Sequence, residues 1–201
     1  MSHEAGKNAW DAVTSLVLVG VGGQGILLAT QIAANAAMIS GFDVKTNEVH
    51  GMAQRGGSVV AQIRFGARVA SPLVPDGTAR ALASLERIEA LRYRNLLAPD
   101  GVAVVSSQAI VPVTVSSGKA AYPADAEERL RRIFPRLMYL DAVGIAEGLG
   151  DARVANVVIL GALSKALSLP EESWMGAIDQ CVKPKYREIN SKAFRAGRAL
   201  K

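Results

Sequence analysis

The feature that most constrains the fold is an apolar run that ends in closely spaced glycines and continues as a helical pattern. Residues 16–19 are too few for a helix, and their continuous apolar character is typical of a strand buried on both faces. The glycines that follow have the G-x-G-x-x-G spacing and comprise Gly20, Gly22 and Gly25. Such glycines permit a tight turn and a close approach of the backbone to a ligand, while the next helix offers free N–H groups to an anion.

The residues after the glycines predict a helix and a second strand. Small apolar residues recur with a 3.6-residue period from Gly25 to Ser40, and Gly41 is placed where a helix commonly ends. Residues 42–47 then have the character of a strand. A strand, a helix and a strand in this order predict a β-α-β unit whose two strands are parallel neighbours.

The remaining elements extend this unit into an α/β fold. Residues 58–65 alternate between apolar and polar, and Gly66 with Ala67 predicts a hairpin turn into residues 68–74. Short apolar runs predict further strands at residues 102–105, 110–115 and 137–140, while residues 79–84 fit either a short strand or the start of a helix. We therefore expect a Rossmann-like three-layer fold, with a mostly parallel sheet, an antiparallel hairpin at one edge and a helical C-terminal third. Residues 1–11 are expected to form a flexible tail, and residues 12–201 a single domain.

Composition narrows the class of protein. Half of the 201 residues are hydrophobic and 20% are charged, which suffices for one globular core. Only 5% are aromatic, so a nucleic-acid stacking surface is not expected, and the net charge of +5 is compatible with an anionic cofactor or an acidic partner. Cys181 is the single cysteine, which excludes an internal disulfide and an iron–sulfur cluster held by this chain.

The apolar region from residue 12 to residue 39 predicts neither a signal peptide nor a membrane span. Asp11 precedes it, and glycines and polar amide residues interrupt it. We expect a cytoplasmic protein that contacts no membrane and no nucleic acid.

A second motif places several chemically active side chains close together in the sequence between two predicted strands. It spans residues 48–58 and contains Glu48, His50, Arg55, the pair Gly56 and Gly57, and Ser58. Loops that follow neighbouring parallel strands lie side by side, so this motif and the first glycines are expected to line one crevice. Arg55 has the geometry to bind a phosphate or carboxylate, the glycines would expose N–H groups to it, and His50 is a possible proton carrier.

Several interpretations remain open from the residues alone. Glu48 suits the acid that binds a ribose in a dinucleotide fold, so a stand-alone NAD or FAD oxidoreductase is one alternative. Another is that the glycines serve only packing and that Arg55 and Glu48 form an ion pair that stiffens the loop. The sequence contains no complete nucleophile–histidine–acid arrangement and no metal-binding spacing, so the chain is expected to contribute to a site that it does not complete.

The two motifs together resemble a known family. GVGGQGILLA (residues 20–29) paired with EVHGMAQRGGSVVAQIRFG (residues 48–66) is similar to the gamma-type subunits of 2-oxoacid:ferredoxin oxidoreductases, with the nearest likeness to the small (beta) subunits of indolepyruvate ferredoxin oxidoreductases. LPEESWMGAI (residues 169–178) and EINSKAFRAGR (residues 188–198) resemble the end of the same subunits. The likeness spans nearly the whole chain and is weakest over residues 106–136.

This resemblance implies a role within a complex. Enzymes of this family oxidatively decarboxylate 2-oxo acids to acyl-CoA and pass the electrons to ferredoxin. The implied substrate is indolepyruvate or another aryl pyruvate. Thiamine diphosphate, Mg and 4Fe-4S clusters would lie on a large alpha-type partner subunit, with no metal and no cofactor bound by this chain alone. Coenzyme A, which carries phosphates, is the implied co-substrate, and it is expected at residues 22–25 and 55–58. The full set of expected cofactor-binding residues is Gly22, Gly23, Gln24, Gly25, Glu48, Arg55, Gly56, Gly57 and Ser58. A non-catalytic assembly module is the third interpretation.

Overall fold

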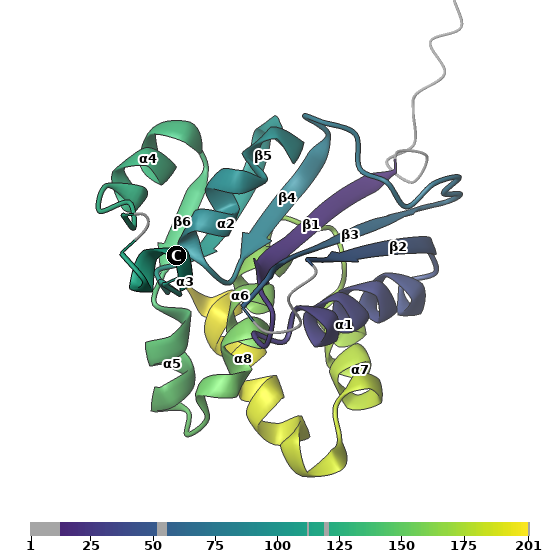
Figure 1. Cartoon of the computed structure of the whole chain (residues 1–201). Helices are drawn as coiled ribbons and strands as arrows, with labels where there is room; N and C mark the ends of the chain where they lie inside the picture. The colour runs from purple at the N-terminus through teal and green to yellow at the C-terminus, as the bar shows by residue number, and fades with distance from the viewer. Residues whose placement is uncertain (1–12, 52–55, 112, 119–120, 201) are drawn as a thin grey trace, which may run out of the picture.

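The computed structural model describes residues 13–51, 56–111, 113–118 and 121–200. The predicted tail, residues 1–11, and Arg55 lie outside this part of the chain. Within it, one sheet has the strand order β2-β3-β1-β4-β5-β6 (Figure 1). Its strands are β1 (Thr14–Val21), β2 (Asp43–His50), β3 (Ser58–Gly66), β4 (Ala79–Ser84), β5 (Leu97–Ser106) and β6 (Leu137–Leu140).

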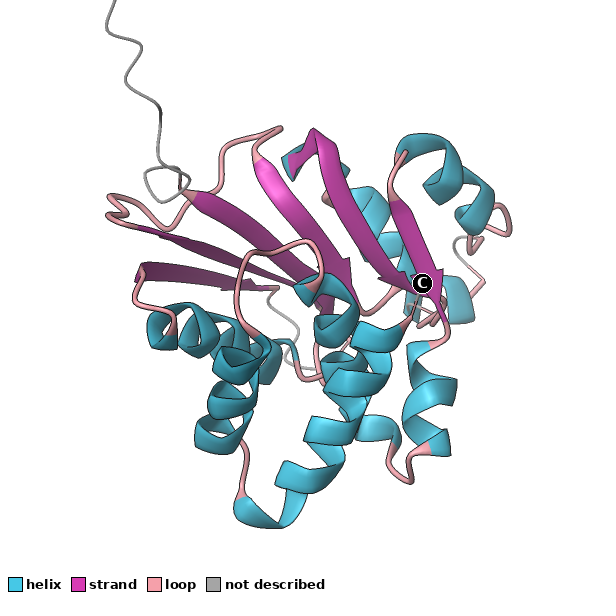
Figure 2. Cartoon of the chain, turned by 180° about the vertical axis from the view of Figure 1, so that it is seen from behind, coloured by secondary structure: helices cyan, strands magenta, loops and turns pink. Residues whose placement is uncertain are grey.

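Helices cover both faces of this sheet (Figure 2). The helices are α1 (Ile26–Ile39), α2 (Arg87–Arg92), α3 (Val113–Ser116), α4 (Ala126–Ile133), α5 (Ala142–Gly148), α6 (Ala155–Ser164), α7 (Glu171–Cys181) and α8 (Arg187–Ala199). Single turns of 3₁₀ helix are η1 (Arg94–Leu96), η2 (Ala152–Val154) and η3 (Pro184–Tyr186). The larger core cluster joins one sheet face to α1, α6, α7 and α8, and the smaller one joins the other face to α2 and α4. The predicted three layers and helical C-terminal third are confirmed.

The position of β3 differs from the expectation. β1 and β2 were predicted to be parallel neighbours, but β3 lies between them and pairs antiparallel with both. The expected parallel pair is therefore wrong, although β1 pairs in parallel with β4 on its other side. Since β1 is buried on both faces from Ser15 to Val21, it has the character of a central strand whichever neighbour lies beside it.

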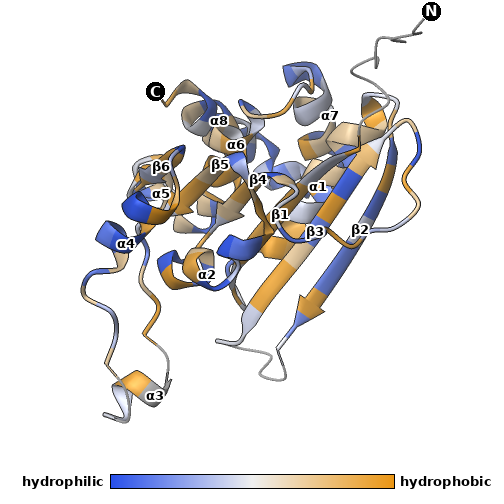
Figure 3. Cartoon of the chain, turned by 90° about the horizontal axis from the view of Figure 1, so that it is seen from above, coloured by the Kyte–Doolittle hydropathy of each residue, from blue (hydrophilic) through white to orange (hydrophobic). Residues whose placement is uncertain are grey.

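The antiparallel hairpin at the sheet edge is confirmed, but its strands are β2 and β3. The predicted turn at Gly66 and Ala67 leads into residues that form no strand in the described part of the chain. Side chains of the hairpin hold these residues instead, because Asp43 accepts a hydrogen bond from the amide of Val69 at 2.7 Å and Gln62 accepts one from Val74 at 2.6 Å. β2 forms the outer edge, and hydrophilic residues dominate it (Figure 3), as expected for an exposed edge.

One further prediction is wrong, and one open interpretation is resolved. Residues 110–115 were expected to form a strand, but the described residues 107–111 form no strand and α3 begins at Val113. The segment stands apart from the body of the molecule and therefore cannot join the sheet (Figure 3). Residues 79–84, by contrast, are the strand β4, which is buried except at Arg80.

The tightest helix contact joins α6 to α8. Gly161 of α6 lies against the backbone of Phe194, and Gly197 of α8 lies against the backbone of Val158. A Cβ atom at either glycine would overlap a carbonyl oxygen of the facing helix. The two helix backbones are therefore in direct contact, which only glycine permits.

We predict that Gly161→Ala or Gly197→Ala lowers the free energy of unfolding by about 3 kcal/mol or more, because neither facing backbone can move without disturbing the core. Gly148→Ala at the end of α5 is the matched control. A Cβ there meets nothing within 4 Å, so its effect should stay within about 1 kcal/mol. Urea unfolding measures all three, and equal stability of the Gly161 and control variants would contradict the close helix contact.

Candidate functional site at the glycine turn

The glycine turn, residues 20–25, connects the end of β1 to the start of α1. Gly23 and Gly25 have φ angles of +101° and +78°, which other residues adopt only with strain. A Cβ on Gly25 would come within 2.6 Å of the side-chain nitrogen of Asn156, whereas one on Gly23 would meet nothing within 4 Å. Gly25 is thus required for packing, while Gly23 leaves open space beside the backbone.

The turn and the second motif lie together, as the sequence predicts. The amide of Gly22 donates a hydrogen bond to the carbonyl of Gly57 at 2.8 Å, and Gly51 donates to Ser58 at 3.0 Å. This proximity arises because the start of β3 pairs with the end of β1, with Ser58 opposite Val21. The expected crevice therefore exists, although an antiparallel strand and not a parallel neighbour brings the loops together.

A cleft of about 630 Å³, here named the turn cleft, lies between the two motifs. It is lined by Val21, Gly22, Gly23, Gly25, Ile26, Leu27, His50, Gly51 and Val59. Gly25 begins α1 without a side-chain cap in the described part of the chain. The first amide groups of a helix favour an anion when no side chain caps them, so this cleft suits an anionic group beside an apolar one.

His50 and Glu48 lie on the same face of β2. They oppose Val59 and Ala61 of β3, which face α1. His50 lines the turn cleft, and its Nε2 atom lies 4.0 Å from a carboxylate oxygen of Glu48. The strand that carries Glu48, β2, is separated from β1 by β3. In a dinucleotide-binding fold, the acid that binds the ribose ends the strand directly beside the one that leads into the glycine turn. This position disfavours the NAD or FAD alternative.

Gln24 makes its contacts within the protein. Its Oε1 atom accepts from the amide of Val21 at 2.7 Å, and its Nε2 atom donates to the carbonyl of Leu85 at 2.8 Å and to Oε1 of Gln108 at 2.7 Å. A Cβ on Gly20 would come within 2.7 Å of Oε1 of Gln24. The side-chain amide therefore joins the glycine turn to two other segments, and Gly20 provides the space for it.

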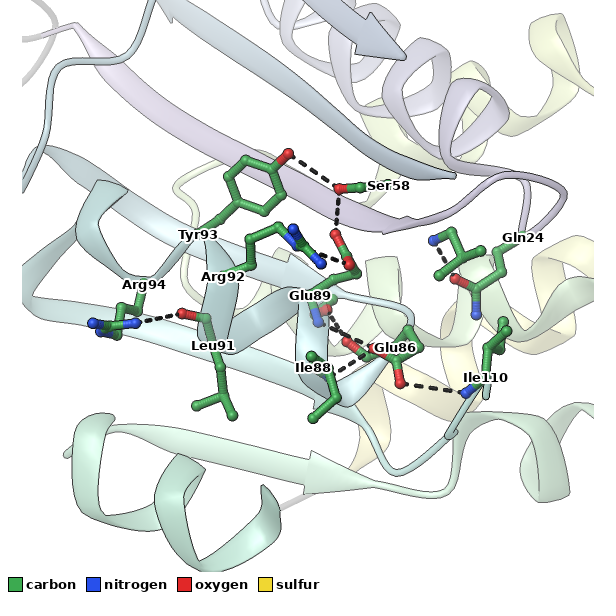
Figure 4. Close-up of polar contacts among 12 residues, drawn as sticks. Gln24, Ser58, Glu86, Ile88, Glu89, Leu91, Arg92, Tyr93, Arg94 and Ile110 are labelled. Carbon is green, nitrogen blue, oxygen red and sulfur yellow. Dashed lines mark hydrogen bonds and ion pairs between the residues drawn. The ribbon is translucent and has the colours of Figure 1, made fainter. Parts of the chain in front are cut away.

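Ser58 points to the opposite face of the sheet from His50. Its hydroxyl donates a short hydrogen bond to the buried carboxylate of Glu89 and lies 3.1 Å from the hydroxyl of Tyr93 (Figure 4). Arg92 donates to the other oxygen of Glu89 at 3.1 Å. Gly56 and Gly57 precede Ser58, and Gly56 has a φ angle of +76°. Because His50 and Ser58 lie on opposite faces of the sheet, the second motif contributes side chains to both faces at this end of β3.

A second cleft of about 380 Å³, here named the side cleft, lies on the other side of the turn. Residues that were not predicted as site residues line it, among them Gln108, Arg153 and Asn156. Asn156 is buried in the otherwise apolar helix α6 and donates to the carbonyl of Gly25 at 2.9 Å. A single amide side chain in an apolar helix was the available signal, since buried polar groups need partners.

Arg153 lies at the rim of the side cleft and is paired with Asp151. Its guanidinium holds both carboxylate oxygens, at 2.6 Å and 3.0 Å for Oδ2 and 2.9 Å for Oδ1. This pairing lowers the pKa of Asp151 to about 2. Much of the positive charge of Arg153 is thus balanced locally, and we assign it no ligand.

The described residues contain no group of three or more His, Cys, Asp or Glu side chains placed to hold a metal ion. Burial raises the pKa of the Cys181 thiol, partly offset by a hydrogen bond from Asn35, so this cysteine is not an activated thiolate. Among the described helices, none is both long and apolar enough to span a bilayer.

Comparison with known proteins identifies the family. The model of the pyruvate ferredoxin/flavodoxin oxidoreductase family matches residues 15–200. The chain belongs to this family. The indolepyruvate oxidoreductase subunit IorB of Archaeoglobus fulgidus is 41% identical over 187 residues, which are 91% of this chain and 92% of that protein. The pyruvate/ketoisovalerate oxidoreductases common subunit gamma of Pyrococcus furiosus is 28% identical over 89% of this chain and 90% of that protein. The resemblance seen in the two motifs is confirmed.

Solved structures share the fold. The gamma subunit of a keto/oxoacid ferredoxin oxidoreductase from Geobacter sulfurreducens superimposes with a TM-score of 0.67 at 24% identity, covering 92% of this chain and 95% of that one. A 2-oxoglutarate:ferredoxin oxidoreductase from Magnetococcus marinus, solved with 2-oxoglutarate, coenzyme A and succinyl-CoA bound, gives 0.70 at 18% identity. The match covers 93% of this chain but 30% of that one, so the same fold there is part of a much longer polypeptide.

We predict that Ser58→Ala lowers the free energy of unfolding by about 1–3 kcal/mol, because the buried Glu89 carboxylate loses a donor. Ser168→Ala, in the exposed turn before α7, is the control and should change stability by less than about 0.5 kcal/mol. Urea unfolding distinguishes them. A Ser58→Ala protein as stable as the parent would mean that Arg92 and Tyr93 satisfy Glu89 without Ser58.

Proposed function

We propose that this chain is the small subunit of a thiamine-dependent 2-oxoacid oxidoreductase complex that acts on indolepyruvate or another aryl pyruvate. In the reaction the 2-oxo acid loses carbon dioxide, the acyl group passes to coenzyme A, and the electrons pass to ferredoxin. The 41% identity to an indolepyruvate oxidoreductase subunit over nine-tenths of both chains supports the substrate class. The complex would be cytoplasmic.

The observation that carries the proposal is the junction of the two motifs. The Gly22–Gly57 hydrogen bond joins the two motifs beside the turn cleft, and Gly23 has open space beside its backbone. Coenzyme A fits this set of groups, because its phosphates suit the uncapped start of α1 and its pantetheine suits apolar residues such as Leu27 and Val59. Its proposed contacts remain Gly22, Gly23 and Gly25, with Gly22 lining the cleft and its amide bonded to Gly57.

The contacts of the other predicted ligands support them to different degrees. The position of Gly56 and Gly57 beside the turn favours a role for their backbone, while Arg55 remains a proposed phosphate ligand. The side chains of Gln24 and Ser58 are engaged by protein groups, so we propose that they shape the site. Glu48 is proposed to orient His50, the side chain here that is best placed to carry a proton.

Thiamine diphosphate and the iron–sulfur clusters are assigned to a large partner subunit. A single cysteine cannot hold such a cluster, and the related fold in the Magnetococcus marinus enzyme forms 30% of a longer chain. When bound to that partner, thiamine diphosphate supplies the carbanion chemistry of decarboxylation. This chain would close the coenzyme A side of the shared site.

We predict that the natively purified protein is recovered with a larger iron-containing subunit and that the complex, but not the isolated chain, decarboxylates indolepyruvate. Iron analysis and an assay with ferredoxin and coenzyme A test this. Decarboxylation by the isolated chain would refute the assignment as a dependent subunit.

We predict that Gly23→Ala raises the KM for coenzyme A at least about tenfold in the reconstituted complex, because the new Cβ occupies the open side of the turn and a charge-assisted contact is worth about 1.5–3 kcal/mol. Gly41→Ala is a matched control. Gly41 also has a positive φ angle and open space around it, but it lies at the far end of α1, about 21 Å away.

Both variants should lose similar stability, about 1–3 kcal/mol from backbone strain, so only binding separates them. If Gly23→Ala assembles normally and leaves the KM for coenzyme A unchanged, the glycine turn serves packing, and the assembly-module interpretation is favoured.

A further inference from the structure

Glu86 is a buried carboxylate that the proposed function does not use. It follows β4, and only 2% of it is exposed. Its Oε2 atom accepts hydrogen bonds from the amides of Ile88 at 2.7 Å and Glu89 at 3.1 Å, which caps the start of α2 (Figure 4). Its other oxygen faces a different part of the chain, so capping explains only half of its contacts.

The Oε1 atom of Glu86 joins both ends of the segment that carries α3. It accepts from the amide of Ile110 at 3.3 Å and from the hydroxyl of Tyr122 at 2.6 Å. Arg87 donates to the same Tyr122 hydroxyl at 3.0 Å. Burial and the adjacent carboxylate raise the pKa of Tyr122 to about 12, so at neutral pH the hydroxyl keeps the proton that it donates.

Residues 107–111, here named the neck, connect this carboxylate to the glycine turn. Within the neck, the carbonyl of Gln108 accepts from the amide of Arg87 at 3.1 Å. The side chain of Gln108 accepts from Gln24, which also binds Val21 within the glycine turn. Hydrogen bonds thus join Glu86 to the neck at Ile110 and the neck to the turn at Gln108, two residues earlier in the chain.

The amide of Gln24 makes three hydrogen bonds in this connection. Its oxygen accepts one hydrogen bond and its nitrogen donates two, one of them to a backbone carbonyl that can only accept. Gln24 and Gln108 together form part of the wall of the side cleft. Displacement of the neck would remove Gln108 from this wall and release one of the three bonds that fix Gln24.

We propose that Glu86 and Tyr122 are positioning residues for the glycine turn: by clamping the neck they hold Gln108 against Gln24 and so fix the turn in its ligand-binding geometry. Neither residue touches the turn itself, and both act through Gln108. The inference rests on the proposed function, in that coenzyme A is taken as the ligand of the turn.

Tyr122→Phe is the sharpest variant, because it removes one hydroxyl and keeps the ring. In the full chain, hydrogen exchange of the neck amides, including that of Ile110, should accelerate about tenfold, as expected for the loss of one buried hydrogen bond. Tyr186→Phe is the control, since its ring lies at η3 against Arg153 and Lys185. It should leave exchange in the neck unchanged.

In the reconstituted complex, Tyr122→Phe should raise the KM for coenzyme A several-fold while kcat changes less than about twofold. Gln108→Ala should have the same effect, and adding Tyr122→Phe to it should cause little further change, because both act through one contact. A purely structural role would lower the amount of folded complex without this selective change in KM.

The outcomes separate this inference from the proposed function. Unchanged exchange in the neck of Tyr122→Phe would overturn the clamp. Faster exchange with an unchanged KM for coenzyme A would overturn the positioning role, provided that Gly23→Ala still raises KM. If Gly23→Ala also leaves KM unchanged, coenzyme A is not the ligand of the turn, and this inference fails together with the assignment of coenzyme A to the turn.

Discussion

The antiparallel pairing of β3 with β1 is the constraint on which the rest of the structure depends. It extends from Thr14 opposite Phe65 to Val21 opposite Ser58, so the second motif ends beside the start of the glycine turn. The same pairing moves β2 to the edge of the sheet and places Glu48 two strands from β1. The insertion of β3 between β1 and β2 therefore joins the two motifs. It also removes Glu48 from the strand next to β1, where an acid would bind the ribose of a dinucleotide.

Polar side chains then fix the turn that this pairing has placed. Gln24 binds Val21, Leu85 and Gln108, and Asn156 binds the carbonyl of Gly25. Amide side chains that make several hydrogen bonds in a partly buried setting hold a backbone more precisely than apolar packing does. Gly23 thus lies in a turn whose neighbouring residues are fixed while its own outer side is open, which is the arrangement expected of a site that binds a ligand through its backbone.

The elements were largely predictable from the sequence, but their pairing was not. The buried strand, the glycines and Gly41 have local signals, because periodicity and backbone freedom are properties of neighbouring residues. Whether residues 58–65 pair with the strand before them, the strand after them or β1 depends on contacts between distant segments. The candidate site followed the same division. The glycines and His50 were predicted from the sequence and lie together at the turn cleft, whereas Glu86, Gln108 and Asn156 were not predicted, because their contacts arise only when segments far apart in the chain meet.

The insertion of β3 also has a consequence for how the chain folds. Both strands that flank β1 follow it in sequence, and the nearer of them begins only at Ser58. During synthesis the most apolar strand therefore emerges long before either neighbour exists to cover its edges. Such non-local pairing forms slowly and leaves a folding intermediate with exposed apolar strand edges that is prone to aggregation. Heterologous production should therefore depend on chaperones more strongly than is usual for a protein of this size.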